Sequence, residues 1–121
     1  MTMLEVRAQA KYVRTSTHKA KLVLDLIKGK PASEALSILR FTKKAVARDV
    51  EKTLRSAIAN AVFVAERNEK RRLDEDDLFV SACHASQGPS LKRIRPAPMG
   101  RAYGIIKRSA HLTVQVAERE K

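Results

Sequence analysis

Residues 78–117 read LFVSACHASQGPSLKRIRPAPMGRAYGIIKRSAHLTVQVA, and this stretch decides the fold. Residues 78–86 are predicted to form a strand, and LTVQV at 112–116 alternates apolar and polar side chains as a second, half-buried strand does. Between the two strands, residues 88–104 hold three glycines, three prolines, four bases and no acid. Loops longer than about 12–15 residues are rare in a compact domain unless they carry a function. We therefore predict that the strands pair antiparallel and that 78–117 forms one long β-hairpin.

The charge of this hairpin indicates what it lies against. Residues 81–111 carry six bases and no carboxylate, and the chain of 121 residues carries 25 bases against 13 acids, a net charge of +12. A carboxylate facing phosphates would be repelled by them, so a long acid-free stretch suits a surface that faces a polyanion. A lone two-stranded hairpin is only marginally stable in water, so this one needs a partner surface. The alternative is an ordinary mobile surface loop.

The sequence upstream of the hairpin supplies the rest of a small domain. Residues 4–12 alternate strictly, which predicts a strand. Its inward face would hold Leu4, Val6, Ala8, Ala10 and Tyr12. Three helices should follow, and their apolar stripes consist of Ala20, Val23, Leu24 and Ile27, of Ala35, Leu36 and Leu39, and of Val46, Val50, Leu54, Ala57, Ala61 and Val64.

Cap and turn residues predict where these helices begin and end. The run Thr15-Ser16-Thr17 offers N-caps for the first helix, and Gly29 ends it. Pro31 fits the first turn of the second helix. Thr42 can cap the third helix, which should extend from about 43 to 67.

The predicted fold class is α+β, with three helices packed on a small antiparallel sheet and a long protruding β-hairpin. Apolar residues make up 44% of the chain and aromatic residues only 4%, so the core must be built from Val, Leu, Ile and Ala. We expect a single polyanion-binding domain over residues 1–121, of which 83–111 is an extended basic hairpin.

No motif of an enzyme or a metal site is present in the sequence. Cys83 is the only cysteine, so it can form neither an intramolecular disulfide nor a paired-cysteine zinc site, and we interpret it as a structural strand residue. The run 74–77 (DEDD) lacks the spacing of a calcium loop, and we interpret it as a turn before the strand at Leu78 or as a partner for basic neighbours. We therefore expect no enzyme activity, no catalytic residues, no metal, no cofactor and no small-molecule substrate. We also expect no membrane partner. No apolar run approaches the roughly 18–20 residues of a membrane span. Binding to a membrane surface would favour Trp or Phe beside the bases, and Trp is absent.

Two kinds of polyanion remain as partners. A small basic DNA-binding protein of the nucleoid type would place a recognition helix with base-reading polar side chains in the major groove. The predicted helices instead spread Lys and Arg along their lengths, which suits positioning on the phosphates of a folded RNA. The candidate RNA-binding residues outside the hairpin are Arg7, Lys11, Arg14 and Lys19, together with Arg48, Lys52 and Arg55, which form a stripe at i, i+4 and i+7. The alternative for that stripe is an ordinary solvated helix face.

Five stretches of the chain follow one another in an order that is typical of a known family. They are LVLDLIKGK at 22–30, SAIANA at 56–61, GPSLKRIRP at 88–96, Gly100-Arg101-Ala102, and Lys107-Arg108 followed by HLTVQV at 111–116. Together they resemble the family of bacterial-type large-subunit ribosomal protein twenty-two. The resemblance implies an α+β domain near the peptide exit and a hairpin that runs inward through rRNA to line the exit tunnel. The implied partners are large-subunit rRNA of the 23S type, neighbouring large-subunit ribosomal proteins and the nascent polypeptide.

The resemblance also implies roles for residues of the hairpin. The hairpin bases that would bind rRNA are Lys92, Arg93, Arg95, Arg101, Lys107 and Arg108. The tip that would line the tunnel consists of Leu91, Lys92, Arg93, Ile94, Arg95, Pro96, Ala97, Pro98, Met99, Gly100, Arg101 and Ala102. The implied function is that of a structural constituent of the large subunit that assists its assembly. The implied location is the cytoplasm, in the ribosome, with an organellar ribosome as the alternative.

Overall fold

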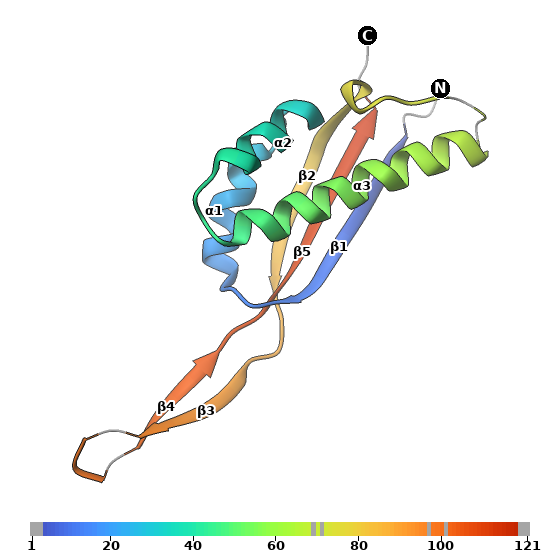
Figure 1. Ribbon diagram of the computed structural model, residues 1–121. Coiled ribbons are helices and arrows are strands. Elements are labelled where there is room, and N and C mark those ends of the chain that lie inside the picture. Colours follow the sequence, from blue (N-terminus) through green and yellow to red (C-terminus); the bar gives the residue numbers. More distant parts are fainter. Residues whose placement is uncertain (1–3, 69, 71, 97, 101, 119–121) are drawn as a thin grey trace.

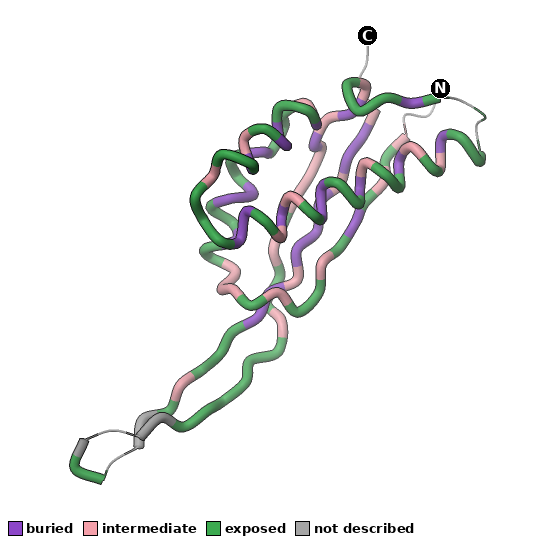
Figure 2. The backbone as a smooth tube through the Cα atoms, in the orientation of Figure 1, coloured by how far each residue is buried: buried purple, intermediate pink, exposed green. Residues whose placement is uncertain are grey.

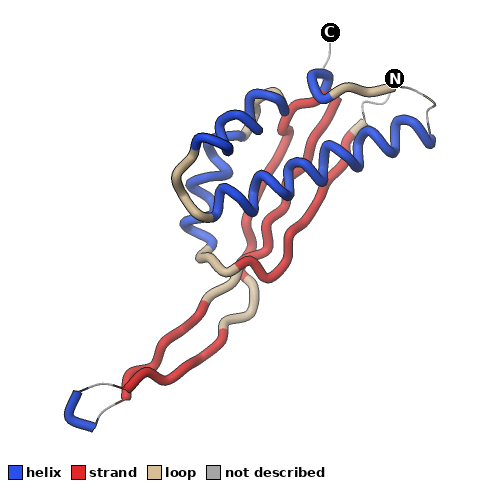
Figure 3. The backbone as a smooth tube through the Cα atoms, viewed as in Figure 1, coloured by secondary structure: helices blue, strands red, loops and turns tan. Residues whose placement is uncertain are grey.

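The computed structural model describes residues 4–68, 70, 72–96, 98–100 and 102–118. The elements follow in the order β1 (Glu5–Val13), α1 (Thr17–Ile27), α2 (Ala32–Phe41), α3 (Val46–Asn68), η1 (Glu75–Asp77), β2 (Leu78–Gln87), β3 (Leu91–Pro96), η2 (Pro98–Gly100), β4 (Ala102–Lys107) and β5 (Ala110–Glu118). The helices cover one face of a sheet, and a two-stranded ribbon projects from one end of it (Figures 1 and 3). The predicted α+β fold with a protruding hairpin is therefore confirmed.

The sheet has three strands in the order β1-β5-β2, and both neighbours of β5 run antiparallel to it. Because β5 is the central strand, side chains of β1 and β2 flank its own side chains and reduce their exposure on both faces. Val114 pairs with Ala8 on one side and with Cys83 on the other, and it is fully buried. Thr113, on the face of β5 away from the helices, is still only 5% exposed. The alternation of residues 112–116 therefore predicted the strand correctly, and the central position explains why its outer face is nearly closed too.

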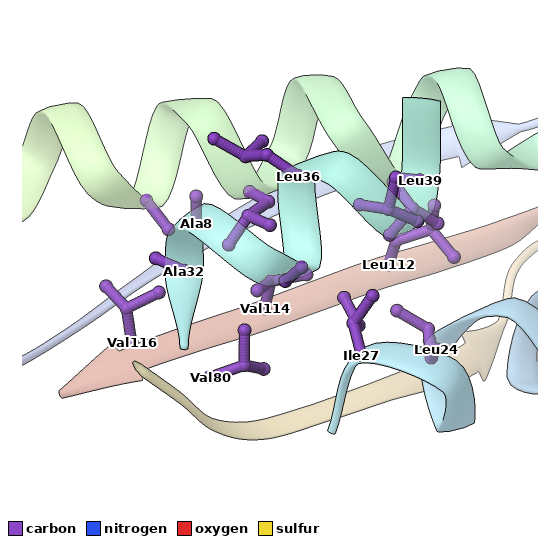
Figure 4. Packing of buried hydrophobic residues seen from close by; sticks show 14 of the residues in the cluster. Ala8, Leu24, Ile27, Ala32, Leu36, Leu39, Val80, Leu112, Val114 and Val116 are labelled. Atoms are coloured by element: carbon purple, nitrogen blue, oxygen red, sulfur yellow. The ribbon is translucent and has the colours of Figure 1, made fainter. Parts of the chain in front are cut away.

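The core lies between the helices and the inner face of the sheet. Figure 4 shows side chains of the helices and the strands packed in one cluster; Leu24, Ile27, Ala32, Leu36 and Leu39 come from α1 and α2, and Val80, Leu112, Val114 and Val116 come from β2 and β5. Burying one such aliphatic side chain stabilises a fold by about 1.5–3 kcal/mol relative to leaving it exposed. The core contains aliphatic side chains almost throughout, as the low aromatic content requires.

The long helix α3 crosses the sheet with small side chains facing inward. Ala57, Ala61 and Ala65 are fully buried, so the helix backbone can approach β1 and β5 closely. The predicted stripe along this helix is confirmed up to Ala61. At its end the core position belongs to Ala65, whereas Val64 is only half-buried.

The prediction that Tyr12 belongs to the core face of β1 is wrong. The register of β1 against β5 shifts between Ala10 and Val13, and Tyr12 has a φ of 59°, so its side chain leaves the core face and is 64% exposed. Its ring packs edge-on against the ring of His111 with centroids 5.0 Å apart, and its backbone N–H donates to Nδ1 of His111 at 3.1 Å.

The helix ends agree with the sequence at two positions and differ at two. The Oγ of Ser16 accepts from the N–H of Lys19 and caps α1, and Gly29 follows that helix with a φ of 79°, as predicted. Pro31 lies one residue before α2 rather than in its first turn. The prediction that Thr42 caps α3 is wrong: its hydroxyl donates to the carbonyl of Ile38 at 2.6 Å, which closes α2, and α3 begins only at Val46.

Candidate nucleic-acid interface

The projecting hairpin is the ribbon beyond the sheet, residues 88–109. The globular part comprises residues 4–87 and 110–118. In the projecting hairpin β3 and β4 pair antiparallel, with Leu91 opposite Lys107, Lys92 opposite Ile106 and Arg93 opposite Ile105. Opposite residues share one face and successive residues alternate between faces, so each face carries both a base and an aliphatic side chain. The ribbon therefore has no apolar face to lay against a core.

Most of the described side chains of the projecting hairpin are open to solvent in the isolated chain. Leu91, Ile94 and Ile106 are 45%, 78% and 54% exposed, and Met99 at the tip is 95% exposed. Figure 2 shows the contrast between this ribbon and the buried strands above it. Large exposed aliphatic side chains beside bases are typical of a surface that is covered by a partner.

The projecting hairpin joins the sheet through a bonded neck. The ladder is interrupted between Gln87 and Leu91 on one strand and between Lys107 and Ala110 on the other. Across this gap the N–H of Gly88 donates to the carbonyl of Ser109 at 2.9 Å, and the Ser109 hydroxyl donates to the carbonyl of Pro89 at 2.6 Å. An added Cβ on Gly88 would lie 2.7 Å from Oγ of Ser109, so the strands approach this closely only because residue 88 is a glycine.

The structure places most of the predicted hairpin bases but not all of their side chains. Lys92, Arg93, Lys107 and Arg108 are exposed. Of the predicted tip, Leu91, Lys92, Arg93, Ile94, Met99 and Gly100 are described, and Ala97 and Arg101 lie outside the described residues. The side chains of Arg95, Pro96, Pro98 and Ala102 also lie outside them. The η2 turn at the tip brings both Met99 and Gly100 into the left-handed region, with φ values of 65° and 72°.

The predicted bases of the globular part are all exposed, and they fall into two groups. The first group comprises Arg7, Lys11, Arg14 and Lys19, from β1 to the first turn of α1. Because Val13 pairs with Ala110, beside the neck, the turn that follows β1 lies at the end of the sheet from which the projecting hairpin leaves (Figure 1). These bases therefore extend the charge of the projecting hairpin onto the globular part.

The second group is the stripe of Arg48, Lys52 and Arg55 on α3. Arg48 and Lys52 are exposed, and neither forms an ion pair within the described part of the chain. Arg55 is held by Glu51 one turn earlier, with Nη2 3.0 Å and Nε 3.3 Å from the same carboxylate oxygen. Since surface pairs of this kind contribute little to stability, this pairing leaves Arg55 available to a stronger anion.

Sequence reasoning missed Lys43 and Lys44, which form the connection between α2 and α3. Lys44 lines a groove of about 650 Å³ together with Arg14 and Lys19, so three segments of the chain contribute bases to it. The only signal in the sequence is the Lys43-Lys44 pair itself, next to a helix end. Its proximity to residues 14–19 depends on how α1 and α3 pack and has no sequence pattern.

Residues 8–117 match the family model of ribosomal protein L22p/L17e. The chain belongs to this family. It is similar to the large ribosomal subunit protein uL22 of Solibacter usitatus, with 49% identity over 117 residues that cover 97% of this chain and 99% of the relative. The uL22 of Clostridium acetobutylicum is 50% identical over 117 residues, 97% of this chain and 100% of the relative, and that of Syntrophobacter fumaroxidans is 48% identical over 116 residues, 96% and 100%.

The match to the L22p/L17e family begins in β1 and ends in β5, so it spans the projecting hairpin as well as the globular part. No helix within the described ranges combines the length and hydropathy that a bilayer crossing requires. Among the described residues, no three His, Cys, Asp or Glu side chains are grouped to hold a metal ion. The acidic run before β2 forms the short η1 turn, as predicted, with the N–H of Asp74 donating to Oδ2 of Asp77 at 3.2 Å.

Cys83 lies half-buried in β2, on the side of the strand that faces α1. Its thiol donates to the backbone carbonyl of Leu24 at 3.4 Å. Burial raises the pKa of the Cys83 thiol above its ordinary value; Lys28 lowers this pKa and Asp25 raises it further. A raised pKa keeps the thiol protonated and weakly nucleophilic at neutral pH, which agrees with a structural residue.

Proposed function

We propose that this chain is a structural constituent of the large ribosomal subunit that binds large-subunit rRNA. The observation that carries the proposal is the projecting hairpin, whose two faces both expose bases beside aliphatic side chains. A ribbon that lies on a surface has one face for its partner and one for water, whereas this ribbon has two similar faces. A partner that encloses the ribbon would use both faces, and the acid-free charge of residues 81–111 favours a polyanion as that partner. Relatives named as large ribosomal subunit proteins support rRNA as that polyanion.

We further propose that the globular part lies near the peptide exit and that the projecting hairpin lines the exit tunnel, as the family resemblance implies. From Gly88 to Pro96 the hairpin reaches roughly 26 Å at about 3.3 Å per residue, which suits penetration into RNA rather than contact at its surface. Residues 1–121 would then act as one rRNA-binding domain, with 83–111 as its inward extension. Its tip would meet the nascent polypeptide, and its globular part would meet neighbouring large-subunit proteins and assist assembly.

The rRNA-binding residues of this proposal come from three surfaces. They are the hairpin bases Lys92, Arg93, Arg95, Arg101, Lys107 and Arg108, the first group Arg7, Lys11, Arg14 and Lys19, and the α3 stripe Arg48, Lys52 and Arg55. If six to ten of them each neutralise one phosphate, the logarithm of the binding constant should fall with the logarithm of the salt concentration with a slope of roughly −4 to −9.

A filter-binding titration against protein-free large-subunit rRNA at several salt concentrations measures this slope. A steep slope supports the proposal, and a slope near zero overturns its electrostatic basis. Sedimentation of the native protein from a cell lysate tests the assignment to the ribosome, because the protein should travel with large subunits. A protein that travels with chromosomal DNA instead would be a small basic DNA-binding protein.

A further inference from the structure

A groove lies where the turn after β1, the first turns of α1 and the start of α3 meet. It has a volume of about 650 Å³, and the residues that matter for its chemistry are Arg14, Lys19, Leu22, Lys44, Val46 and Asp49. This volume falls within the range of sites that hold a small organic molecule. The segments that line the groove lie toward the end of the globular part from which the projecting hairpin leaves, so a polyanion that encloses the hairpin would pass close to them (Figure 1).

The rim of the groove is basic. Arg14, Lys19 and Lys44 are exposed, and none of them has an ion-pair partner among the described residues. Asp49 also lines the groove but is half-buried. Three bases against one recessed acid make the rim attractive to phosphate.

Part of the groove lining is aliphatic, which a site for phosphate alone does not need. Leu22 lines the groove and is 44% exposed, and Val46 at the start of α3 also lines it but is only 8% exposed. Nearby, one turn further along α1, Leu26 is 46% exposed but does not line the groove. A ligand that covers Leu22 and Val46 and also meets the three bases needs an apolar part and an anionic part. A nucleotide has both, since its base is flat and its phosphate is charged.

We propose that this groove binds one unstacked nucleotide of the rRNA, with its base or ribose against Leu22 and Val46 and its phosphates at Arg14, Lys19 and Lys44. The proposal rests on the proposed function, because it names the part of the RNA that one surface of the protein recognises. Unstacked bases of single-stranded loops and bulges are the parts of RNA that proteins read individually. The groove would thus fix the position of the globular part on the RNA, while the projecting hairpin supplies most of the phosphate contacts.

Salt titrations separate the two kinds of contact. Lys19→Gln should reduce the slope of log K against log salt by about 1, since one phosphate contact is lost. Leu22→Asn should lower the affinity for large-subunit rRNA about three- to tenfold at every salt concentration and leave the slope unchanged. The matched controls are Lys21→Gln and Leu26→Asn, which change exposed residues of the same helix outside the groove and should leave both quantities unchanged.

The outcomes distinguish this proposal from the proposed function. If the wild-type protein does not bind rRNA steeply with salt, the proposed function fails and the groove proposal fails with it. If the wild-type protein binds steeply but Leu22→Asn and Leu26→Asn behave alike, only the groove proposal is overturned. A change in slope for Lys19→Gln with no effect of Leu22→Asn also overturns it, because the groove would then contact phosphates alone.

Ultraviolet cross-linking of the wild-type complex gives a second, independent readout. Mass spectrometry of the digested complex should find a mononucleotide adduct on the peptide that spans residues 14–22, and Leu22→Asn should remove that adduct while cross-links to the projecting hairpin persist. Hairpin cross-links without an adduct on 14–22 would overturn the proposal. Thermal melts of all four variants establish that each one is folded, which is expected because the substituted side chains are exposed.

Discussion

The same two chain segments run from the globular part into the projecting hairpin. Their aliphatic side chains are buried in the globular part and largely exposed in the hairpin. In the globular part β2 and β5 pair under the helices, and Val80 and Leu112 are fully buried. Beyond the neck the chain continues as β3 and β4, where Ile94 is 78% and Ile106 is 54% exposed. Strand pairing is antiparallel in both regions, so pairing alone does not bury these side chains. The helix layer buries them in one region, and nothing within the described chain does so in the other.

This difference in burial separates the region that is stabilised by its own core from the region that exposes bases. The globular part obtains its stability from its own core, because α1, α2 and α3 cover one face of the sheet. The projecting hairpin has bases and aliphatic side chains on both faces, and no helix of the described chain covers either face. Removing the hairpin should therefore cost affinity without costing stability, whereas changes at the neck should affect both regions.

The largest effect is expected when the projecting hairpin is shortened. Replacing residues 91–107 by Asn-Gly, which favours a tight two-residue turn, removes five of the hairpin bases. The slope of log K against log salt should become shallower by about 4–5, and the affinity for large-subunit rRNA should fall on the order of 10³-fold at moderate salt. The free energy of unfolding should remain within about 0.5 kcal/mol, because the side chains described between 91 and 107 lie outside the core.

Two measurements check this prediction on the same protein. Filter binding gives the slope and the affinity, and urea-induced unfolding gives the stability. A shortened protein that no longer folds would mean that the hairpin belongs to the core and that the two regions are not separable. A shortened protein that folds and still binds rRNA with an unchanged slope would mean that the bases of the globular part carry the binding.

The same comparison explains how much of the structure the sequence predicts. Residues 112–116 alternate clearly because one face of β5 packs on helices, so the strand and its inward face were predicted correctly. The bounds of β3 and β4 have no such signal, because a ribbon exposed on both faces has no reason to alternate. The hairpin was predicted from its flanking strands and its charge, not from its own periodicity.

The remaining errors have local causes that a single sequence does not reveal. Tyr12 continues the alternation of β1, yet a register shift next to it turns its side chain toward His111. Thr42 is a good N-cap residue type, yet its hydroxyl donates to the carbonyl of Ile38 in α2, and α3 begins four residues later. The basic groove needs residues from the β1–α1 turn and from the start of α3, and only the packing of the helices brings them together.

A smaller effect is expected at the neck. Gly88→Ala would place a Cβ 2.7 Å from Oγ of Ser109 and 3.2 Å from Cε1 of His111, so the Ser109 hydroxyl must leave the carbonyl of Pro89. Because Ser109 is buried, the lost hydrogen bond should lower the free energy of unfolding by about 1–3 kcal/mol, measured in urea. Gly104→Ala is the matched control, since an added Cβ there meets nothing within 4 Å.

A double-mutant cycle shows whether the neck bond is the cause. In a Ser109→Ala background the clashing hydroxyl is absent, so Gly88→Ala should cost less than it does in the wild type. Equal costs in the two backgrounds would contradict the role assigned to Ser109. Equal costs for Gly88→Ala and Gly104→Ala would show that the neck is as permissive as the open ribbon.

The smallest effect is expected at Cys83, which lies on β2 between the core and the neck. A substitution there shows where the globular part ends. Its thiol donates to the carbonyl of Leu24 and packs against the core, so Cys83→Ala should lower the free energy of unfolding by about 1 kcal/mol and leave rRNA affinity unchanged. Because burial raises the pKa of the folded thiol above its unfolded value, the unfolded state releases its proton first as the pH rises. The wild-type protein should therefore lose a little stability above the ordinary thiol pKa of about 8.5, and the variant should not. A loss of rRNA affinity with stability unchanged would instead place Cys83 in the interface, and the boundary between the two regions would lie further into β2.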